Sequence, residues 1–335
     1  MKILIIGPRY YNYLDAAAAA FGKLGHEVVV EPYDNPIHPY TPMMKVRYKL
    51  SRHKERLQER SRTLFNAFIL KRFGETGPGL VFILNGEILY EETLDKFRES
   101  AKVGIWFFDN REKLPLATGH IDHADALFCF ENDDVQWYAR QGKKAYFLPQ
   151  ACDCGIYRPL GLEKDIDIVF VGTLYTSRKR RRTTEALCRR FPELKIEVYG
   201  LYRPWYKGLL KCLTRPRKDV FLNRNVNAAQ ANELYNRARI ALNIHQEFQK
   251  DGANPRVFEI CGSGAYQICD RNPYVESLFP DGEIGLYSTE EELFSLVEKA
   301  LRENTAERAE AARNMVLSRH SYEVRMKTVL EKLGF

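Results

Sequence analysis

Residues that suit the binding of an anionic ligand follow a short apolar run at 240–244. Asn254 precedes Pro255, a pair typical of a helix start, because asparagine can cap a helix and proline lacks the N–H that the first position leaves unpaired. Arg256 lies in the first turn of this helix and Glu259 about one turn further on. Unpaired N–H groups and the helix dipole stabilise phosphate there. The segment therefore predicts a diphosphate site, with Glu259 placed to take ribose hydroxyls.

Two series of alternating strands and helices supply the sheets that would position these residues. The first series runs from a β-branched strand at 2–6 to a strand at 145–148, and the second begins with a strand at 166–171 that closes on Gly172. Strands that alternate with helices form parallel sheets covered by helices. The sequence thus predicts an α/β protein made of two Rossmann-like domains.

The predicted boundary lies in a loosely patterned stretch between the two series, near residues 150–165. It gives an N-terminal domain of residues 1–155 and a C-terminal domain of residues 156–335. Because ligands bind beyond the carboxyl ends of parallel strands, the two sheets are expected to face one inter-domain cleft.

Two carboxylates of the N-terminal domain follow apolar runs, at the edge of the predicted sheet where ligands bind. They are Asp109 and, one strand earlier, Glu87. Burial beside Trp106 and Phe108 would raise the pKa of Asp109 toward that of a useful general base. Asp109 is therefore the first candidate for a catalytic residue and Glu87 the second. The alternative for Asp109 is a side chain that caps the turn following it.

Patterns that would indicate a metal or a redox cofactor are weak. The turn at 7–12 follows the first strand but lacks the second and third glycines of a dinucleotide site. Asp165 and Asp167 have the spacing of a metal-binding pair, yet they precede a strand instead of following one. No bound metal and no cofactor are predicted.

The charge distribution predicts an anionic partner. The formal net charge is +7, and much of it lies in two stretches, 45–72 and 203–224. The first reads as part of an amphipathic helix at 44–71 that lies on its own domain. Within the second, Arg203–Lys218 mixes Trp, Tyr and Leu with cations, which is typical of a contact with an anionic membrane. A packed insertion is the alternative for this segment.

The seven cysteines are scattered, and no export signal or spanning apolar run is recognisable. A cytoplasmic protein with reduced thiols, peripheral to the membrane at most, is therefore expected. The positive charge by itself would also fit a nucleic acid, but no nucleic-acid partner is predicted.

The segment from Asn254 to Ala265, Asn-x-Arg-Val-Phe-Glu-Ile-Cys-Gly-x-Gly-Ala, resembles the C-terminal signature of group 1-type glycosyltransferases, in the branch that includes CgeB-like spore-maturation proteins. Three further segments are similar to the same branch: 167–172 with Arg178 after it, 233–243, and 320–325. The resemblance covers most of residues 145–335 and reaches the first 145 residues only in outline.

The resemblance implies a GT-B architecture whose last helix, from about residue 320, crosses back to the N-terminal domain. It also implies transfer of a sugar from a nucleotide diphosphate to an acceptor held by that domain. Two acidic residues eight apart bracket the donor in this family. Here Glu259 would contact the ribose and Asp251 the sugar hydroxyls, although the family usually has Glu at the latter position.

The resemblance further places Gly172 in the donor site and the basic residues after it on the diphosphate, and Arg178 aligns best among them. Such enzymes need no metal, because the helix dipole and basic side chains neutralise the leaving diphosphate. Simpler interpretations remain open: Glu259 could be an exposed helix residue, Arg256 could pair with an acid, and the run 178–182 could be a solvated face.

Two other functions fit the same pattern. A non-catalytic nucleotide-sugar or carbohydrate-binding assembly factor is one, since Asp251 departs from the family. A nucleotide-sugar epimerase of the same architecture is the other. The acceptor of a transferase could be a glycan, a lipid-linked sugar or a protein.

Overall fold

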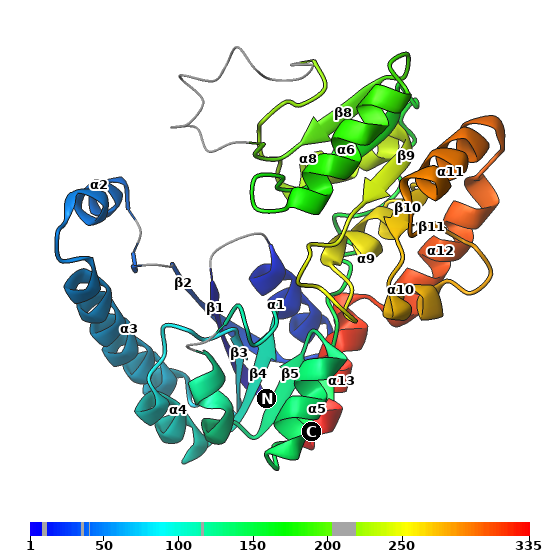
Figure 1. The fold of residues 1–335 in the computed structure, drawn as a ribbon. Helices are drawn as coiled ribbons and strands as arrows, with labels where there is room; N and C mark the ends of the chain where they lie inside the picture. The colour runs from blue at the N-terminus through cyan, green and yellow to red at the C-terminus, as the bar shows by residue number, and fades with distance from the viewer. Residues whose placement is uncertain (9–11, 35–36, 40, 115–116, 203–218) are drawn as a thin grey trace. The chain divides into compact units, whose positions relative to one another are not determined.

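The computed structural model describes residues 1–335 except 9–11, 35–36, 40, 115–116 and 203–218. The proposed membrane segment Arg203–Lys218 therefore lies outside the described residues. The chain forms two compact units (Figure 1). Unit 1 consists of Met1–Pro149 and Tyr322–Phe335, and unit 2 of Gln150–Ser321. Each unit contains one parallel sheet covered by helices, so the predicted α/β class is confirmed.

The sheet of unit 1 has six strands in the order β2-β1-β3-β4-β5-β6, and every pairing is parallel. The strands are β1 (Lys2–Pro8), β2 (Glu27–Tyr33), β3 (Leu80–Leu84), β4 (Lys102–Phe107), β5 (Ala126–Cys129) and β6 (Ala145–Phe147). Strands β1 and β3 are continuous apolar runs, as expected of parallel strands that are buried on both faces.

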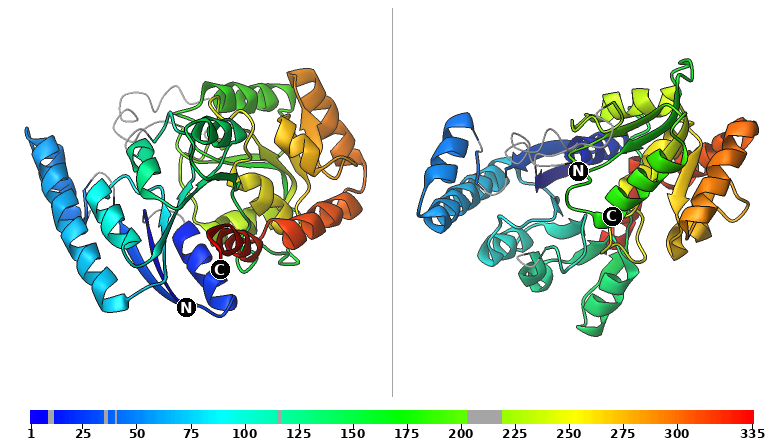
Figure 2. Two further views of the ribbon diagram at one scale, coloured as in Figure 1. Left: turned by 90° about the horizontal axis from the view of Figure 1, so that it is seen from below. Right: turned by 45° about the horizontal axis from the view of Figure 1, so that its top comes forward.

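Helices cover both faces of this sheet. The helices of unit 1 are α1 (Tyr13–Lys23), α2 (Pro42–Leu50), α3 (Lys54–Thr76), α4 (Glu91–Arg98), the 3-10 helix η1 (Ala117–His123), α5 (Asn132–Arg140) and α13 (Tyr322–Leu333), of which α2 packs on α3 and not on the sheet. Helices α1 and α13 pack together on one face, and α3 and α4 lie on the other (Figure 2). The last helix contacts β4 and β5 as well as α1, and Tyr322 packs against Trp106.

The basic segment at 44–71 differs from its prediction, because it forms two helices. Helix α2 ends at Leu50, where the extended backbone of Ser51 stops it, and α3 begins at Lys54. Helix α3 lies on its own unit as expected and buries Phe65 and Ile69. Helix α2 buries no residue, so the expectation that the whole segment packs on its own domain is wrong for this part.

The sheet of unit 2 has five parallel strands in the order β11-β10-β9-β7-β8. They are β7 (Ile166–Val171), β8 (Ile196–Tyr199), β9 (Ala238–Asn243), β10 (Gln267–Asp270) and β11 (Gly285–Tyr287). The helices are α6 (Arg178–Arg190), α8 (Ala228–Arg237), α9 (Pro255–Gly262), α10 (Pro273–Leu278), α11 (Glu290–Arg302) and α12 (Ala306–Arg319). Two apolar cores fill the two faces, one under α8, α9 and α12 and the other under α6 and α11.

Gly262 ends α9 where the helix packs tightly against the segment that opens unit 2. A Cβ at this position would lie 2.4 Å from Cys152 Sγ and 3.3 Å from the carbonyl oxygen of Tyr157. Only glycine allows this approach, since heavy atoms that close repel strongly.

We expect Gly262→Ala to lower the free energy of unfolding by about 1–3 kcal/mol, because the added methyl group overpacks this contact. Urea titration followed by circular dichroism measures the effect. The matched control is Gly74→Ala in α3, where the added Cβ meets no atom within 4 Å. A Gly262→Ala protein as stable as the wild type would show that α9 can shift away from Cys152.

Within the residues that the structure describes, no helix combines the length and the apolar composition needed to cross a bilayer.

Candidate functional site

The carboxyl ends of three neighbouring strands meet at one edge of the sheet in unit 2. Strand β9 lies between β7 and β10 and runs parallel to both. Gly172 follows β7, His245 follows β9, and Asp270 is the last residue of β10. The loop after β9 leads to α9, and the loop after β7 leads to α6. Most of the donor-binding residues predicted from the sequence therefore gather at this edge, where parallel sheets bind ligands.

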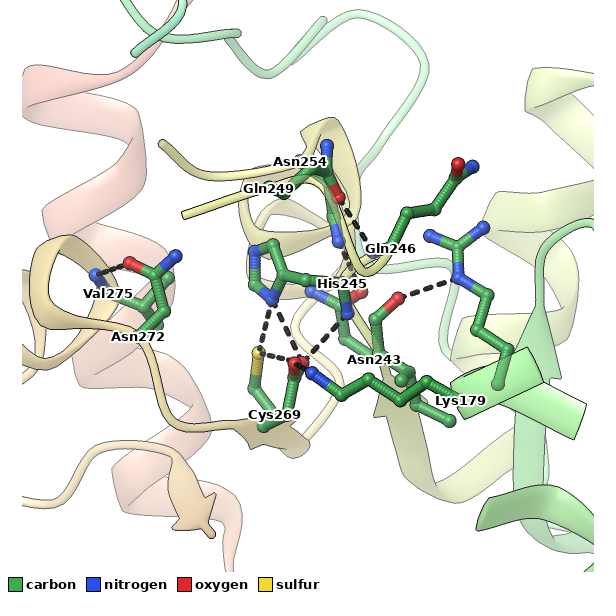
Figure 3. A network of polar contacts seen from close by, with 12 residues as sticks. Lys179, Asn243, His245, Gln246, Gln249, Asn254, Cys269, Asn272 and Val275 are labelled. Atoms are coloured by element: carbon green, nitrogen blue, oxygen red, sulfur yellow. Dashed lines mark hydrogen bonds and ion pairs between the residues drawn. The ribbon is translucent and has the colours of Figure 1, made fainter. Parts of the chain in front are cut away.

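Helix α9 begins as the sequence predicts, but its cap differs. Asn254 stands at the N-cap in an extended conformation, and Pro255 is the first helical residue. The Asn254 side chain makes no capping bond; its Nδ2 instead donates to Asn243 Oδ1 at 3.0 Å (Figure 3). The expected side-chain cap is thus wrong, because the amide reaches across to β9. Asn254 Oδ1 is buried without a hydrogen-bond partner among the described residues.

Glu259 lies on the second turn of α9 and is 4% exposed, so the interpretation as an exposed helix residue is wrong. Burial raises the pKa of its carboxyl, and the charge of Arg256 and a hydrogen bond from Tyr157 oppose that rise. Arg256 Nε lies 3.8 Å from Glu259 Oε2, so the arginine has an acidic neighbour within its own helix. A buried carboxylate of this kind is a strong acceptor for hydroxyl groups.

Asp251 lies in the loop between β9 and α9 and is partly exposed. Asn272, which caps α10, holds this loop: its Nδ2 donates to the carbonyl oxygens of Gly252 at 2.9 Å and Lys250 at 3.3 Å. The backbone on both sides of Asp251 is therefore fixed by a residue from the end of β10. The sequence alone did not reveal Asn272 as a support for this loop.

Gly172 has a packing role at the end of β7. Its N–H donates to the carbonyl oxygen of Tyr199 at 2.9 Å, and a Cβ here would meet the ring of Phe170 at 2.9 Å. Gly200 approaches from β8 so closely that its own Cβ would lie 2.1 Å from the Gly172 oxygen. The two glycines let the loops after β7 and β8 lie against each other.

The basic residues at the start of α6 point in different directions. Arg178, the first residue of the helix, is exposed. Lys179 pairs with Asp270, and Arg180 is buried and donates from Nε to the carbonyl oxygen of Ile244 at 2.8 Å. The interpretation of this run as a solvated face is therefore wrong for Arg180. The sequence selected Arg178, and it missed that the two residues after it contact the ends of β9 and β10.

A carboxylate side chain of the protein binds the N-terminus of α6. Glu247, in the loop after β9, accepts a hydrogen bond from the backbone N–H of Lys179 at 2.7 Å. Burial acts to raise the pKa of Glu247, but the backbone N–H groups of Lys179 and Arg178 and the hydroxyl of Ser177 hold it below its usual value. Sequence reasoning missed this residue, because nothing local links the loop after β9 to α6.

A polar network joins the exposed Lys179 to the buried Asp270 and His245 (Figure 3). Asp270 Oδ1 accepts from the backbone N–H of His245 at 2.8 Å and lies 2.9 Å from its Nδ1. Burial alone would raise the pKa of Asp270, but the hydrogen bond from His245 and the charge of Lys179 outweigh it and keep the pKa below its usual range. His245 Nε2 is buried, with no hydrogen-bond partner among the described residues.

Among the residues that the structure describes, His245, Cys269 and Asp270 form the one group whose ligand atoms are close enough to hold a metal ion, all within 4.8 Å of one another. The sequence did not predict this group. Its chemistry fits metal binding poorly, because burial raises the pKa of the Cys269 thiol, and a metal ligand must be the thiolate. Lys179 and His245 already satisfy Asp270.

The two carboxylates predicted in unit 1 lie near each other at the carboxyl edge of its sheet. Asn85, which follows β3 with φ 60°, accepts at Oδ1 from the N–H of Phe108 at 2.9 Å and so ties the exits of β3 and β4 together. Glu87 Oε2 accepts from the hydroxyl of Tyr33 at 2.6 Å. Burial raises the pKa of Asp109 to about 6; the nearby Glu87 adds to this rise and Lys113 opposes it.

The rise in the Asp109 pKa that the sequence predicts is thus confirmed, and the capping alternative is wrong. The N–H of Arg111 in the following turn donates to Asp134 Oδ2 at 3.0 Å, and its guanidinium pairs with Asp133 and Asp134. Asp109 makes no hydrogen bond within the described part of the chain. A carboxyl group with a pKa of about 6 is half ionised near pH 6 and mostly ionised at pH 7, which suits a general base.

His120 lies near Asp109 and Glu87, and the sequence did not predict it as a part of this site. It is buried, and its Nε2 lies 3.1 Å from the carbonyl oxygen of Gly86. Burial lowers the pKa of His120 to about 4, so the ring is neutral at pH 7 and donates its Nε2–H to that carbonyl.

Residues 178–331 match the model of a family described as glycosyl transferase-like. The match contains α6, α9 and the loop with Asp251. No curated protein sequence matches the chain.

Solved structures with the same fold align along nearly the whole chain. Sucrose-phosphate synthase from Thermosynechococcus elongatus aligns with a TM-score of 0.68 at 11% identity, covering 99% of this chain and 98% of that one. An α,α-trehalose-phosphate synthase (UDP-forming) from Burkholderia vietnamiensis aligns with a TM-score of 0.63 at 12% identity, covering 99% of each chain. HepE from Anabaena, solved in complex with UDP, gives the same TM-score of 0.63 at 12% identity and covers 99% of each chain.

These structures are GT-B glycosyltransferases, so the GT-B fold predicted from the sequence is confirmed. Together with the family match, the fold supports an enzyme of the glycosyltransferase class. The fold and the family match favour neither a non-catalytic assembly factor nor an epimerase.

Proposed function

We propose that the protein transfers a sugar from a nucleotide diphosphate to an acceptor held by unit 1, without a metal ion, and that it belongs to the CgeB-like branch. The observation that carries the donor assignment is the buried Glu259 on α9, eight residues after Asp251, inside the segment that matches the glycosyltransferase model. The UDP bound to HepE supports a nucleoside diphosphate as part of the donor.

On this proposal Glu259 accepts hydrogen bonds from the ribose, and Asp251 contacts the hydroxyls of the transferred sugar. Arg256 and Arg178 neutralise the diphosphate together with the N-terminus of α9, which Asn254 and Pro255 open. Positive charge placed where the leaving group develops negative charge replaces a divalent cation.

The acceptor binds at the carboxyl edge of unit 1, where Asp109 removes its proton and Glu87 is the second candidate for that role. A glycan, a lipid-linked sugar and a protein side chain each carry a hydroxyl or amine that such a base can activate. We further propose a cytoplasmic protein that contacts anionic membrane through Arg203–Lys218, a segment outside the described residues.

Incubation with UDP-, GDP- and dTDP-sugars tests the proposal. We expect one nucleotide class to raise the melting temperature, because a ligand at a hundred times its Kd stabilises the folded state by about 2.7 kcal/mol. The same donor should be hydrolysed slowly without an acceptor, and EDTA should change neither result. A new sugar on the intact nucleotide would indicate an epimerase, and a melting shift without hydrolysis a binding protein. Activity that EDTA abolishes would overturn metal independence.

A further inference from the structure

Helix α2 exposes an apolar stripe that the described residues of its own unit leave uncovered. Met43, Val46 and Leu50 are between 57% and 78% exposed. Their spacing of three and four residues places them on one face of the helix. Met44 and Tyr48, which lie on a different face, are the partly buried residues of α2. The stripe is therefore not the face by which α2 packs on α3.

Helix α3 also exposes two apolar side chains. Leu64 and Phe68, one turn apart, are 61% and 43% exposed. Of the eleven large apolar side chains that are exposed among the described residues, five lie on α2 and α3. Single exposed apolar residues are ordinary, but an exposed stripe of three on one helix face marks a contact with something else.

Cations flank the stripe on both sides. Viewed down the helix axis, Lys49 lies on one side of the stripe and Arg47 on the other. Residues 41–60 contain seven Lys or Arg against two Glu. Arg47, Lys49, Arg52, Arg56 and Arg60 form no ion pair within the described part of the chain. Their positive charges are thus available to an anionic partner.

The remainder of α3 is firmly held, which distinguishes it from α2. Arg62 donates from Nε to the carbonyl oxygen of Ile88 at 3.2 Å and stacks over the ring of Tyr90. Asn66 donates to the same carbonyl at 2.9 Å and accepts from the N–H of Tyr90 at 2.9 Å. These bonds fix α3 on unit 1, and α2 lies at the N-terminal end of α3 (Figure 1).

We propose that α2, together with the exposed Leu64 and Phe68 of α3, binds an anionic lipid bilayer; these residues are here called the α2–α3 surface. Met43, Val46 and Leu50 enter the boundary between headgroups and acyl chains, and the flanking cations contact lipid phosphates. A narrow apolar stripe bordered by Lys and Arg is the pattern of a helix that lies in a membrane interface. A protein partner would need acidic residues on both sides of an apolar groove, whereas a bilayer supplies that chemistry everywhere. The inference goes beyond the proposed function and needs no sugar donor for its test.

Co-sedimentation with vesicles tests the α2–α3 surface. The full chain should bind vesicles of phosphatidylcholine and phosphatidylglycerol, bind phosphatidylcholine alone weakly, and be released as salt rises. Combined Met43→Ser, Val46→Ser and Leu50→Ser should lower the partition coefficient by at least about tenfold, since three buried apolar side chains are lost. Arg47→Gln with Lys49→Gln should lower it by about tenfold as well.

Controls separate this surface from others. Leu160→Ser with Leu162→Ser removes two exposed leucines from unit 2 and should leave binding unchanged. Because α2 buries no residue, the triple variant should keep the wild-type melting temperature. A third variant, Trp205→Ser with Leu209→Ser and Leu210→Ser, tests the segment Arg203–Lys218 independently.

Three results would overturn the inference. The first is a wild-type chain that does not bind the anionic vesicles. The second is a triple variant that binds as the wild type does, including the case in which only the Trp205 variant loses binding. The third is a wild-type dimer in sedimentation velocity that the triple variant dissociates, which would make this face an interface between two copies.

Discussion

Asp109→Asn is expected to lower kcat by more than about a hundredfold while the affinity for the donor stays unchanged. The carboxyl group follows β4, and burial raises its pKa to about 6. It forms no hydrogen bond with the described residues. Its carboxylate oxygens are therefore not engaged in a structural contact. The amide of asparagine has the same shape but cannot accept a proton at neutral pH.

The pH profile gives the same prediction a second readout. Since the pKa of Asp109 in the folded protein is raised to about 6, the group is protonated below that pH and inactive as a base. The value of kcat/KM should therefore fall as pH falls through about 6. The residual kcat/KM of Asp109→Asn should not show this decrease at acidic pH.

The matched control for Asp109 is Asp133→Asn, which removes an exposed carboxylate of the same unit that pairs with Arg111. Its turnover should be normal. NMR of the product completes the test, because inverting transfer needs a base and retaining transfer does not. If Asp109→Asn loses most of its kcat and the product retains the anomeric configuration of the donor, Asp109 orients the acceptor and is not a base. Near-normal turnover of Asp109→Asn would show that the residue takes no part in the mechanism. If Glu87→Gln alone lost activity, the second candidate would take the role of the base.

Glu259→Ala is expected to weaken the binding of the nucleotide by about ten- to a hundredfold, since a charge-assisted hydrogen bond contributes on the order of 1.5–3 kcal/mol. Isothermal titration calorimetry with the nucleoside diphosphate measures this directly. Glu259→Gln keeps an acceptor oxygen and should fall between the wild type and the alanine variant.

The structure lets this effect be separated from a loss of folding. The pKa of Glu259 is raised by burial, so its ionised form is disfavoured in the folded state, and Glu259→Gln removes that unfavourable charge without changing the volume. Its melting temperature should be kept. Glu276→Ala on α10, which removes an exposed carboxylate paired with Arg271, should leave nucleotide affinity unaltered. Equal affinity of Glu259→Ala and the wild type would mean that the donor site is elsewhere.

The sequence by itself determined the features that depend on local patterns. Short apolar runs such as those at 2–6 and 240–244 predicted strands in both sheets, because strands buried on two faces need no polar alternation. Pro255 predicted the start of α9, since its missing N–H is tolerated only there. The aromatic neighbours of Asp109 predicted its raised pKa, because they precede it directly in the chain.

Tertiary structure decided every feature that joins residues far apart in sequence. The strand order places β9 between β7 and β10, and only this order brings Glu247 to the N-terminus of α6 and Lys179 to Asp270. The amide of Asn254 suits a cap locally, yet Asn243 on β9 takes its hydrogen bond. The apolar residues of α2 have the spacing of a packing face, and only the fold shows that no described residue of unit 1 covers Met43 or Leu50. Spacing fixes which side chains share a face, but the partner of that face is set by which elements the chain brings beside it.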